Sequence, residues 1–346
     1  MERSSPDHGP GDDMELSEDR LIAALSRLLS GGEPGVVLGP GDDAAVLEST
    51  SGQPVLTTDL LVEGVHFERA SISARDLGAK AVTVNVSDIA AMGGSPRAGV
   101  AAIALTPDVD AGWVMELYGG MRDACAEYAL ALVGGDTNRG GLLIVSVTVL
   151  GEVAPGRAVT RSGARPGDAV VVTGSLGAAA GGLAVSRTRA AETAEALSTS
   201  WGRALLDALA RPVARVGEGQ TLARSGATAM MDLSDGLARD LSRLCLASGV
   251  GARVELDAVP VSAALREAAP SLGVDALELA IGGGEDYELL ATLDPGDVDV
   301  ARDVLDERFG VSLTVVGAIV EGAGLTAIDA AGGEAPLEPA GWDHFG

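Results

Sequence analysis

The fold is decided by residues 74–105, which read ARDLGAKAVTVNVSDIAAMGGSPRAGVAAIAL. The first part is apolar over about five helical turns, and the Gly-Gly-Ser-Pro that follows is typical of a helix end. We therefore predict an apolar helix at Ala74–Met92 and a buried strand at Ala98–Leu105. A helix that leads into a buried strand is typical of an α/β domain.

The alternation of strands and helices continues on both sides of this stretch. Strands are predicted at Pro54–Val62, Leu130–Val133 and Leu142–Val153, with a helix at Asp110–Ala129. The turn Ala154-Pro155-Gly156 then separates this part from a second half of similar α/β character. The predicted organisation is a flexible tail (1–14), an N-terminal α/β domain (15–154) and a C-terminal α/β domain (155–346). The elements expected in the second half are strands at Ala227–Leu233, Gly251–Leu256, Tyr287–Leu293 and Val311–Val320, and helices over 186–205 and at Gly236–Ser248 and Val298–Phe309.

The composition limits the kind of ligand. The chain has 346 residues, of which 50 are acidic and 24 basic, and a formal net charge of −26. Nucleic acid and anionic membranes bind through Lys and Arg, so both are excluded as partners. An anionic substrate would need a local counter-charge, supplied by metal ions or helix N-termini. Lys80 is the only lysine of the chain.

The compartment is expected to be the cytoplasm. The N-terminal sequence is polar and acidic without a signal-peptide pattern, and no apolar stretch has the length and purity of a membrane-spanning helix. Cys125 and Cys245 form no CxxC pair and lie in helical apolar patterns. We therefore expect two buried free thiols in a reducing environment.

Aspartates in apolar or glycine-rich surroundings are the feature that points to chemistry. An isolated carboxylate in such a place is costly, so it is hydrogen-bonded or holds a cation. For each residue alone a helix cap or Asx-turn is an equally good interpretation, except for Asp88, which lies within the apolar helix. Together they favour a shared magnesium site, because Mg²⁺ takes oxygen ligands and bridges phosphates. The set is Asp42, Asp43, Asp59, Asp88, Asp136, Asp232 and Asp235.

Other kinds of site find less support in the sequence. The chain contains no GxxxxGK[ST] motif and no GxSxG elbow. Residues 172–182, VTGSLGAAAGG, form the nearest candidate for a phosphate-binding loop, but a tight turn with close helix packing is the preferred interpretation. His66 is the only histidine in the body of the chain, and it lies close after the strand that carries Asp59.

Ordered motifs extend over nearly the whole chain and carry a family resemblance. They are GDDAAV (41–46), TTDLLVEGVHF (57–67), KAVTVNVSDIAAMGGSPR (80–97), VGGDT (133–137), TRSGARPGD (160–168), DLSDGL (232–237), GGGEDYELL (282–290) and GWDHF (341–345). The chain resembles the thiamine-monophosphate kinase family, within the superfamily related to aminoimidazole ribonucleotide synthetase.

The resemblance implies a two-domain α/β fold and a homodimer in which N-terminal strands of two subunits associate. It implies ATP as co-substrate, several Mg²⁺ ions, and phosphorylation of thiamine monophosphate to thiamine diphosphate. The metal ligands implied are Asp43, Thr57, Thr58, Asp59, Asp88, Asp136, Asp232 and Asp235, of which Asp59, Asp136, Asp232 and Asp235 are the residues expected to be catalytic. The implied nucleotide contacts are Tyr118, Gly135, Asp136, Arg161 and Ser234, and the implied thiamine phosphate contacts are His66, Glu285 and Trp342.

The expected mechanism is direct in-line transfer in which Mg²⁺ bridges the phosphates. The acceptor phosphate has a second pKa of about 6 and is mostly ionised at neutral pH, so no general base is required.

Two alternatives stay open. The first is a sister enzyme of the superfamily. Selenophosphate synthetase would need a cysteine within residues 1–124, and the hydrogenase-maturation relative would need one after Cys245, and the sequence has neither. Aminoimidazole ribonucleotide synthetase remains, although EGVHF (63–67) and GGEDYEL (283–289) fit it poorly. The other alternative is a nucleotide-binding regulatory protein without turnover, which only an activity assay separates from the kinase.

Overall fold

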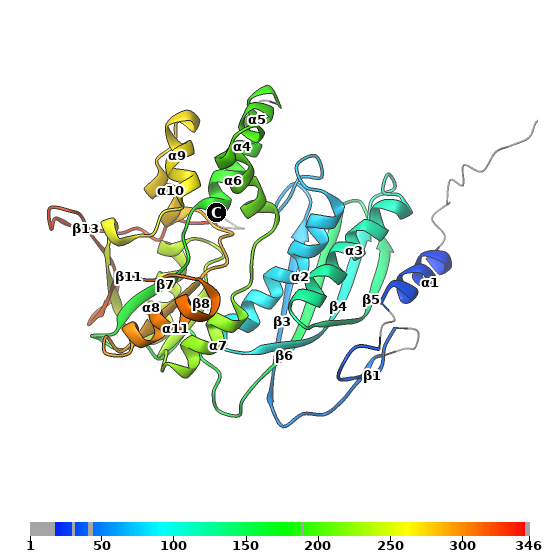
Figure 1. The fold of residues 1–346 in the computed structure, drawn as a ribbon, viewed down its shortest axis with the longest axis horizontal. Helices are drawn as coiled ribbons and strands as arrows, with labels where there is room; N and C mark the ends of the chain where they lie inside the picture. Colours follow the sequence, from blue (N-terminus) through cyan, green and yellow to red (C-terminus); the bar gives the residue numbers. More distant parts are fainter. Residues whose placement is uncertain (1–17, 30–31, 41–43, 189, 343–346) are drawn as a thin grey trace, which may run out of the picture.

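The computed structural model describes residues 18–29, 32–40, 44–188 and 190–342. Figure 1 shows two sheets with their helices, one formed by the first half of the chain and one by the second. The expected tail (1–14) and Asp43 lie outside the described residues. Among the described helices, none has both the length and the apolar character needed to cross a membrane.

The sheet of the first half has the strand order β3-β6-β4-β5. Its strands are β3 (Gln53–Val62), β6 (Ile144–Val153), β4 (Ser95–Leu105) and β5 (Ala131–Arg139). Only β4 and β5 pair in parallel, with the crossover helix α3 (Ala111–Glu127) between them in the chain. The alternation expected for a βαβ arrangement therefore holds for this one unit, and the other pairs in the sheet are antiparallel.

Helix α2 (Ala74–Ala91) is the central element of the first half. It begins at the N-cap Ser73, whose hydroxyl accepts a hydrogen bond from Asp76 N. Two glycines allow α2 and α3 to pack closely, because a Cβ atom on Gly78 would lie 1.9 Å from Leu117 O and one on Gly120 would lie 1.8 Å from Arg75 O. At its other end α2 meets the second half, where Gly219 of α7 (Val216–Arg224) packs against Ala90 O. Helix α2 thus places its C-terminal turns at the junction of the halves.

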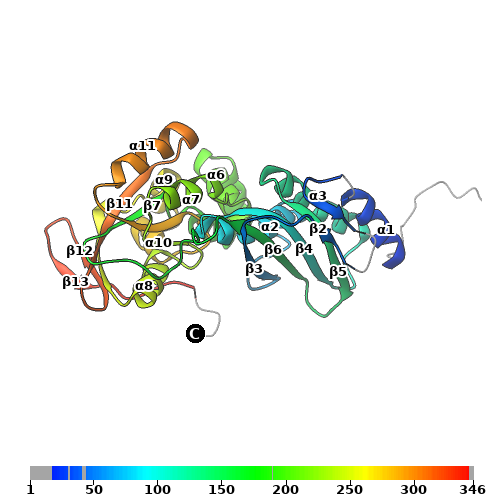
Figure 2. The ribbon, with the colours of Figure 1, turned by 90° about the horizontal axis from the view of Figure 1, so that it is seen from below.

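The opposite side of the first sheet is uncovered in this chain. Figure 2 shows α2 and α3 along one side of the strands. On the other side Leu56, Leu60 and Val100 are exposed to 69%, 50% and 41%. The strand register places Leu56 beside Leu150, Leu60 beside Ser146 and Ala102 beside Ser146, so these side chains share one face. We call this surface the open face.

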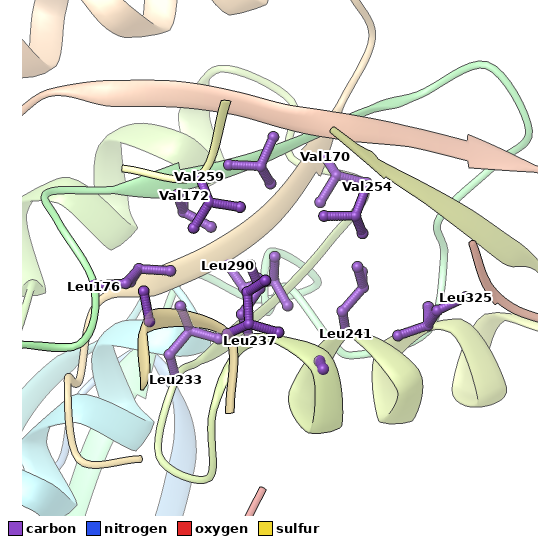
Figure 3. Packing of buried hydrophobic residues seen from close by; sticks show 14 of the residues in the cluster. Val170, Val172, Leu176, Leu233, Leu237, Leu241, Val254, Val259, Leu290 and Leu325 are labelled. Carbon is purple, nitrogen blue, oxygen red and sulfur yellow. The ribbon is translucent and has the colours of Figure 1, made fainter. Parts of the chain in front are cut away.

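The sheet of the second half has the strand order β13-β12-β9-β11-β7-β10-β8. Its inner strand β7 is buried along its whole length, with Val170 and Val172 in one core and Ala169 and Val171 in the other. Figure 3 shows the first of these cores, where Val172 and Leu290 lie above Leu237. The strands are β7 (Ala169–Thr173), β8 (Ala229–Asp232), β9 (Gly251–Glu255), β10 (Leu289–Leu293), β11 (Leu313–Val320), β12 (Gly324–Ile328) and β13 (Glu334–Pro336).

Helices cover both faces of this second sheet. Helix α8 (Leu237–Ser248) packs on the face formed by Val170 and Val172, and α7 and α11 (Val298–Phe309) pack on the other. The helices of this half are α4 (Ala178–Ser186), α5 (Ala190–Leu197), α6 (Ser200–Ala210), α7, α8 (Leu237–Ser248), α9 (Ala263–Leu272), α10 (Ala276–Gly282) and α11 (Val298–Phe309), with a 3₁₀ turn at Leu256–Ala258. The first half also contains α1 (Glu18–Leu29) and the short pair β1 (Val36–Leu38) and β2 (Val46–Leu47).

The α/β fold class is confirmed, with differences at particular elements. Strand β5 is longer than predicted, because its pairing with β4 continues through Gly134-Gly135 as far as Arg139. Gly135 permits this, since a Cβ atom there would lie 2.0 Å from Ala101 O. The helical stretch expected over 186–205 is divided between α5 and α6. Cys125 and Cys245 are buried free thiols, as predicted.

Candidate active site

Strand β3 and helix α2 bring three of the expected residues together. Thr57 and Asp59 alternate on β3 with the side chains of the open face, so both point to the side covered by α2. The Thr57 hydroxyl donates to Asp88 Oδ2 of α2 at 2.5 Å. Burial, and then the charge of Asp88, raises the pKa of Asp59 to about 6. Burial also raises the pKa of Asp88, against the opposing effects of the Thr57 hydrogen bond and the Arg161 charge.

Asp232 joins this group from the second half. It is the last residue of β8, is 4% exposed, and accepts a hydrogen bond from Ser87 Oγ of α2 at 2.7 Å. Burial, and then the charge of Asp88, raises the pKa of Asp232 to about 7. Carboxylates from both halves therefore repel one another across the junction when they are ionised.

A cavity of about 500 Å³ opens onto Asp88 and Asp232. Thr57 and Asp88 line it from the first half, and Arg161 and Asp232 line it from the second. Its remaining walls are largely apolar, so the cavity offers an apolar surface beside a charged end, as a nucleotide requires. The other lining residues are Val55, Leu56, Ala91, Met92, Thr160, Ser162, Met230, Met231 and Ala247.

The donor set fits magnesium held jointly with a phosphate ligand. Within the described part of the chain, no three Asp, Glu, His or Cys side chains are spaced to share one ion. Mg²⁺ is usually bound by one or two carboxylates together with waters and substrate phosphates, so paired carboxylates at a cavity suffice. Burial first, and then the charge of Asp88, raises the pKa of both Asp59 and Asp232, and a bound cation would favour the ionised form of both.

A second group of expected residues lies at the start of α8 and in the loop before β10. Glu285 N donates to Ser234 O at 2.8 Å, and Trp342 N donates to Asp235 O at 3.2 Å. The Asp235 carboxylate is held by Arg243 Nη1 at 2.5 Å. Glu285 has a left-handed backbone with a φ of 68°, which is rare for a residue other than glycine and is concentrated at functional sites. Ser234, Asp235, Glu285 and Trp342 therefore form one contiguous group.

The structure places a third group elsewhere in the first half. Gly135 and Asp136 lie on β5, at the opposite edge of the sheet from β3, and three strand spacings amount to about 14 Å. Asn138 Nδ2 donates to Asp136 Oδ2 at 2.6 Å. Tyr118 is buried beside this strand, and burial raises its pKa to about 12. Within one chain, these residues are not brought to the cavity.

Two further expected residues lie on β3 and in the turn that follows it. The Thr58 hydroxyl points to the open face, where it lies 2.9 Å from Thr148 Oγ1. His66 lies in the turn after β3, where its Nδ1 accepts a hydrogen bond from Val62 N at 3.1 Å.

The glycine-rich turn at 172–182 binds a carboxylate of the protein itself. The Asp286 side chain accepts hydrogen bonds from Gly177 N at 2.7 Å and Ala179 N at 3.4 Å, at the start of α4. A Cβ atom on Gly177 would lie 2.9 Å from Ala280 Cα, so the turn also needs its glycine for close packing. The structural interpretation of this turn is confirmed, because its amides already have an anionic partner.

Three residues at the site were not among those expected. Ser87 holds Asp232, and Lys80 Nζ lies 3.0 Å from Glu285 Oε1. Tyr287 is buried with a φ of 51°, and the charges of Glu285, Asp59, Asp232 and Asp88 add to burial in raising its pKa. Only Lys80 carries a signal in the sequence, as a single lysine within an apolar helix.

Comparison with known proteins identifies the family. The family model "AIR synthase related protein, N-terminal domain" matches residues 41–153, and "AIR synthase related protein, C-terminal domain" matches residues 165–330. Thiamine-monophosphate kinase of Escherichia coli (strain K12) is 39% identical over 96% of this chain and 99% of its own length.

Solved structures agree with this assignment. Thiamine-monophosphate kinase from Stenotrophomonas maltophilia K279a has a TM-score of 0.76 at 36% identity, and the alignment covers 89% of this chain and 94% of that one. A structure described as AaThiL complexed with AMPPCP and TMP has a TM-score of 0.72 at 33% identity, with coverage of 97% and 100%. The chain thus belongs to the thiamine-monophosphate kinase family, within the AIR synthase related proteins, and is a kinase.

Proposed function

We propose that this kinase transfers the γ-phosphoryl group of ATP to thiamine monophosphate and forms thiamine diphosphate. The observation that carries the proposal is the cavity at the junction of the halves, where Asp88 and Asp232 meet beside Arg161. The relative complexed with AMPPCP and TMP supports the choice of both substrates. We further propose that the chain has two domains that meet near residue 154, and that the reaction takes place in the cytoplasm.

The carboxylates of the cavity have a defined part in this proposal. Asp59, Asp88 and Asp232, with the Thr57 hydroxyl, would hold Mg²⁺ with at most two of these carboxylates on any one ion, and the bound metal would supply positive charge to the phosphates of ATP. Ser87 orients Asp232 and Thr57 orients Asp88, so the oxygen atoms are fixed before a ligand arrives. Arg161 supplies the positive side chain of the cavity and would contact the phosphates of ATP.

The acceptor requires little chemistry from the protein. The phosphate of thiamine monophosphate is mostly ionised at neutral pH, so its oxygen can attack without a general base. Direct in-line transfer then depends on positioning and on charge neutralisation. Glu285 and Trp342 are proposed to hold the cationic thiamine moiety, and His66 to contact its phosphate. Trp342 is 41% exposed, which leaves indole surface for stacking on a cationic ring.

A steady-state assay tests this proposal directly. Purified protein with ATP, Mg²⁺ and thiamine monophosphate should form thiamine diphosphate, as followed by chromatography. Product should disappear with EDTA, because the carboxylates alone cannot neutralise the phosphates, and free thiamine should not be phosphorylated. No product from a folded protein that binds ATP would contradict the proposed acceptor.

We also propose that the kinase is a homodimer joined through the open face. Leu56, Leu60 and Val100 expose large apolar side chains on a sheet whose other side is covered by helices. Asp136 pairs in register with Ala102 and therefore belongs to the open face. In such a dimer Asp136 would lie at the interface, so a partner subunit could bring this carboxylate to a site that one chain leaves incomplete.

A charge on the open face should separate the subunits. Leu60→Glu places a carboxylate in the proposed interface, so the variant should elute as a monomer in size-exclusion chromatography with light scattering. Leu246→Glu is the matched control, because Leu246 of α8 is 84% exposed and lies in the other half. A dimer that persists in Leu60→Glu, or a monomeric wild type, would refute the interface.

A further inference from the structure

The single lysine of the chain is buried at the junction of the two halves. Lys80 of α2 is 2% exposed. Its ammonium lies 3.0 Å from Glu285 Oε1 and donates to Leu209 O at 2.9 Å. A buried ammonium requires partners that compensate for lost hydration, and both partners come from the second half. Leu209 lies in the last turn of α6, where the carbonyl groups favour a cation.

Glu285 is constrained by its backbone as well as by this ion pair. Its φ of 68° turns the chain between Gly284 and Asp286, and its N–H is bonded to Ser234 O. Gly284 also packs against Ser234, since a Cβ atom there would lie 2.4 Å from Ser234 O. The backbone therefore fixes the position of the Glu285 Cα atom, and the ion pair with Lys80 fixes the position of the Glu285 carboxylate. The ion pair engages Oε1, and the Glu285 side chain is still 26% exposed.

Joining α2 to α6 does not by itself require this lysine. Asp76, one turn earlier on the same face of α2, forms an ion pair with Arg211 just after α6. That pair contacts neither Glu285 nor the cavity. What distinguishes Lys80 is that its second partner is the Glu285 carboxylate.

We propose that Lys80 is a positioning residue for the acceptor: it holds Oε1 of Glu285 so that Oε2 faces the cationic thiamine moiety. This inference rests on the proposed function, because Glu285 matters for affinity only if thiamine monophosphate is the acceptor. It assigns Lys80 to recognition of the acceptor and not to binding of the ATP phosphates, for which Arg161 is the proposed contact.

Lys80→Met should separate the two substrates kinetically. Without the ammonium the Glu285 carboxylate is free to move, so KM for thiamine monophosphate should rise roughly 10- to 100-fold, with KM for ATP within about twofold of wild type. Titration calorimetry of thiamine monophosphate in the presence of AMPPCP should show the same loss of affinity without turnover. Arg211→Gln is the matched control, because it removes the neighbouring link between α2 and α6 and should leave both KM values unchanged.

A double-mutant cycle decides whether Lys80 acts through Glu285. Combining Lys80→Met with Glu285→Gln should cost no more in acceptor affinity than the more harmful single change, whereas independent effects would multiply. Lys80→Gln, whose amide can still donate to Leu209 O, takes the place of Lys80→Met if that variant does not fold. Multiplying effects, or equal rises in both KM values, would overturn the proposal. Failure of the wild type to phosphorylate thiamine monophosphate would instead refute the proposed function.

Discussion

Replacing Asp232 with asparagine should lower kcat/KM by roughly 10³-fold, which corresponds to about 4 kcal/mol of transition-state stabilisation. Asparagine keeps the volume of the side chain and can still accept the hydrogen bond from Ser87 Oγ, but it removes the negative charge. Asp232 is also repelled by Asp88, so losing its charge should leave the metal-free protein as stable as wild type or more stable. Steady-state kinetics at saturating Mg²⁺ check the loss in kcat/KM. Thermal unfolding without Mg²⁺ checks the stability.

A buried aspartate outside the site provides the control. Asp168 is 7% exposed, and its carboxylate accepts hydrogen bonds from Arg165 N at 2.9 Å and Thr228 Oγ1 at 2.6 Å. Asp168→Asn should therefore affect stability and leave kcat near the wild-type value. Asp59→Asn should behave like Asp232→Asn. Near-normal activity in both Asp59→Asn and Asp232→Asn would mean that these carboxylates share no catalytic metal site.

The second large effect is a dependence of stability on pH that Mg²⁺ removes. The folded protein holds the pKa of Asp59 at about 6 and that of Asp232 at about 7, both above the value of 3.8 for a free side chain. Between about pH 4 and pH 7 the folded state binds more protons than the unfolded state. The free energy of unfolding therefore falls as the pH rises through this range. Without Mg²⁺ the melting temperature should therefore be lower at pH 8 than at pH 5.5, by about 5 °C or more.

Mg²⁺ should act only where the carboxylates are ionised. At pH 8 it should raise the melting temperature by several degrees, because it binds the folded state alone, and at pH 5.5 it should have little effect. Asp286, with a pKa of about 7, and Asp240, with a pKa of about 6, add to the pH dependence from elsewhere in the second half. Asp232→Asn should therefore lose most of the Mg²⁺ effect and keep part of the pH effect. Differential scanning calorimetry with and without EDTA would show this, and an equal Mg²⁺ effect at both pH values would contradict it.

The elements of the fold were predictable where local pattern alone decides them. Helix α11 matches its predicted range, and α2 differs only at Met92, because both have clear apolar patterns and clear end signals. Pairing between strands was not predictable, since an apolar strand does not specify its neighbour. The order β3-β6-β4-β5, which puts Asp59 and Asp136 at opposite edges, comes from tertiary packing.

In the site too, the residue types could be predicted from local sequence, whereas contacts between residues far apart in the chain could not. Carboxylates in apolar surroundings indicated a charged site, and the structure brings Asp59, Asp88 and Asp232 together. The Ser87–Asp232 hydrogen bond joins residues 145 positions apart, and no local pattern specifies such a contact. Lys80 was noticeable only because it is the sole lysine, and its partner Glu285 could not be inferred from spacing. The roles assigned to His66, Tyr118 and Trp342 stay predictions.

Asp88 belongs to α2 of the first half and Asp232 to β8 of the second, so the distance between the halves and the charge of the site depend on each other. With the carboxylates ionised and no cation present, their repulsion favours a wider separation of the halves. In the proposed reaction, a Mg²⁺ ion held between Asp88 and Asp232 would replace that repulsion with attraction to both carboxylates. The contact between the two halves would then be strongest while the metal is bound and weakest when the site is empty at alkaline pH.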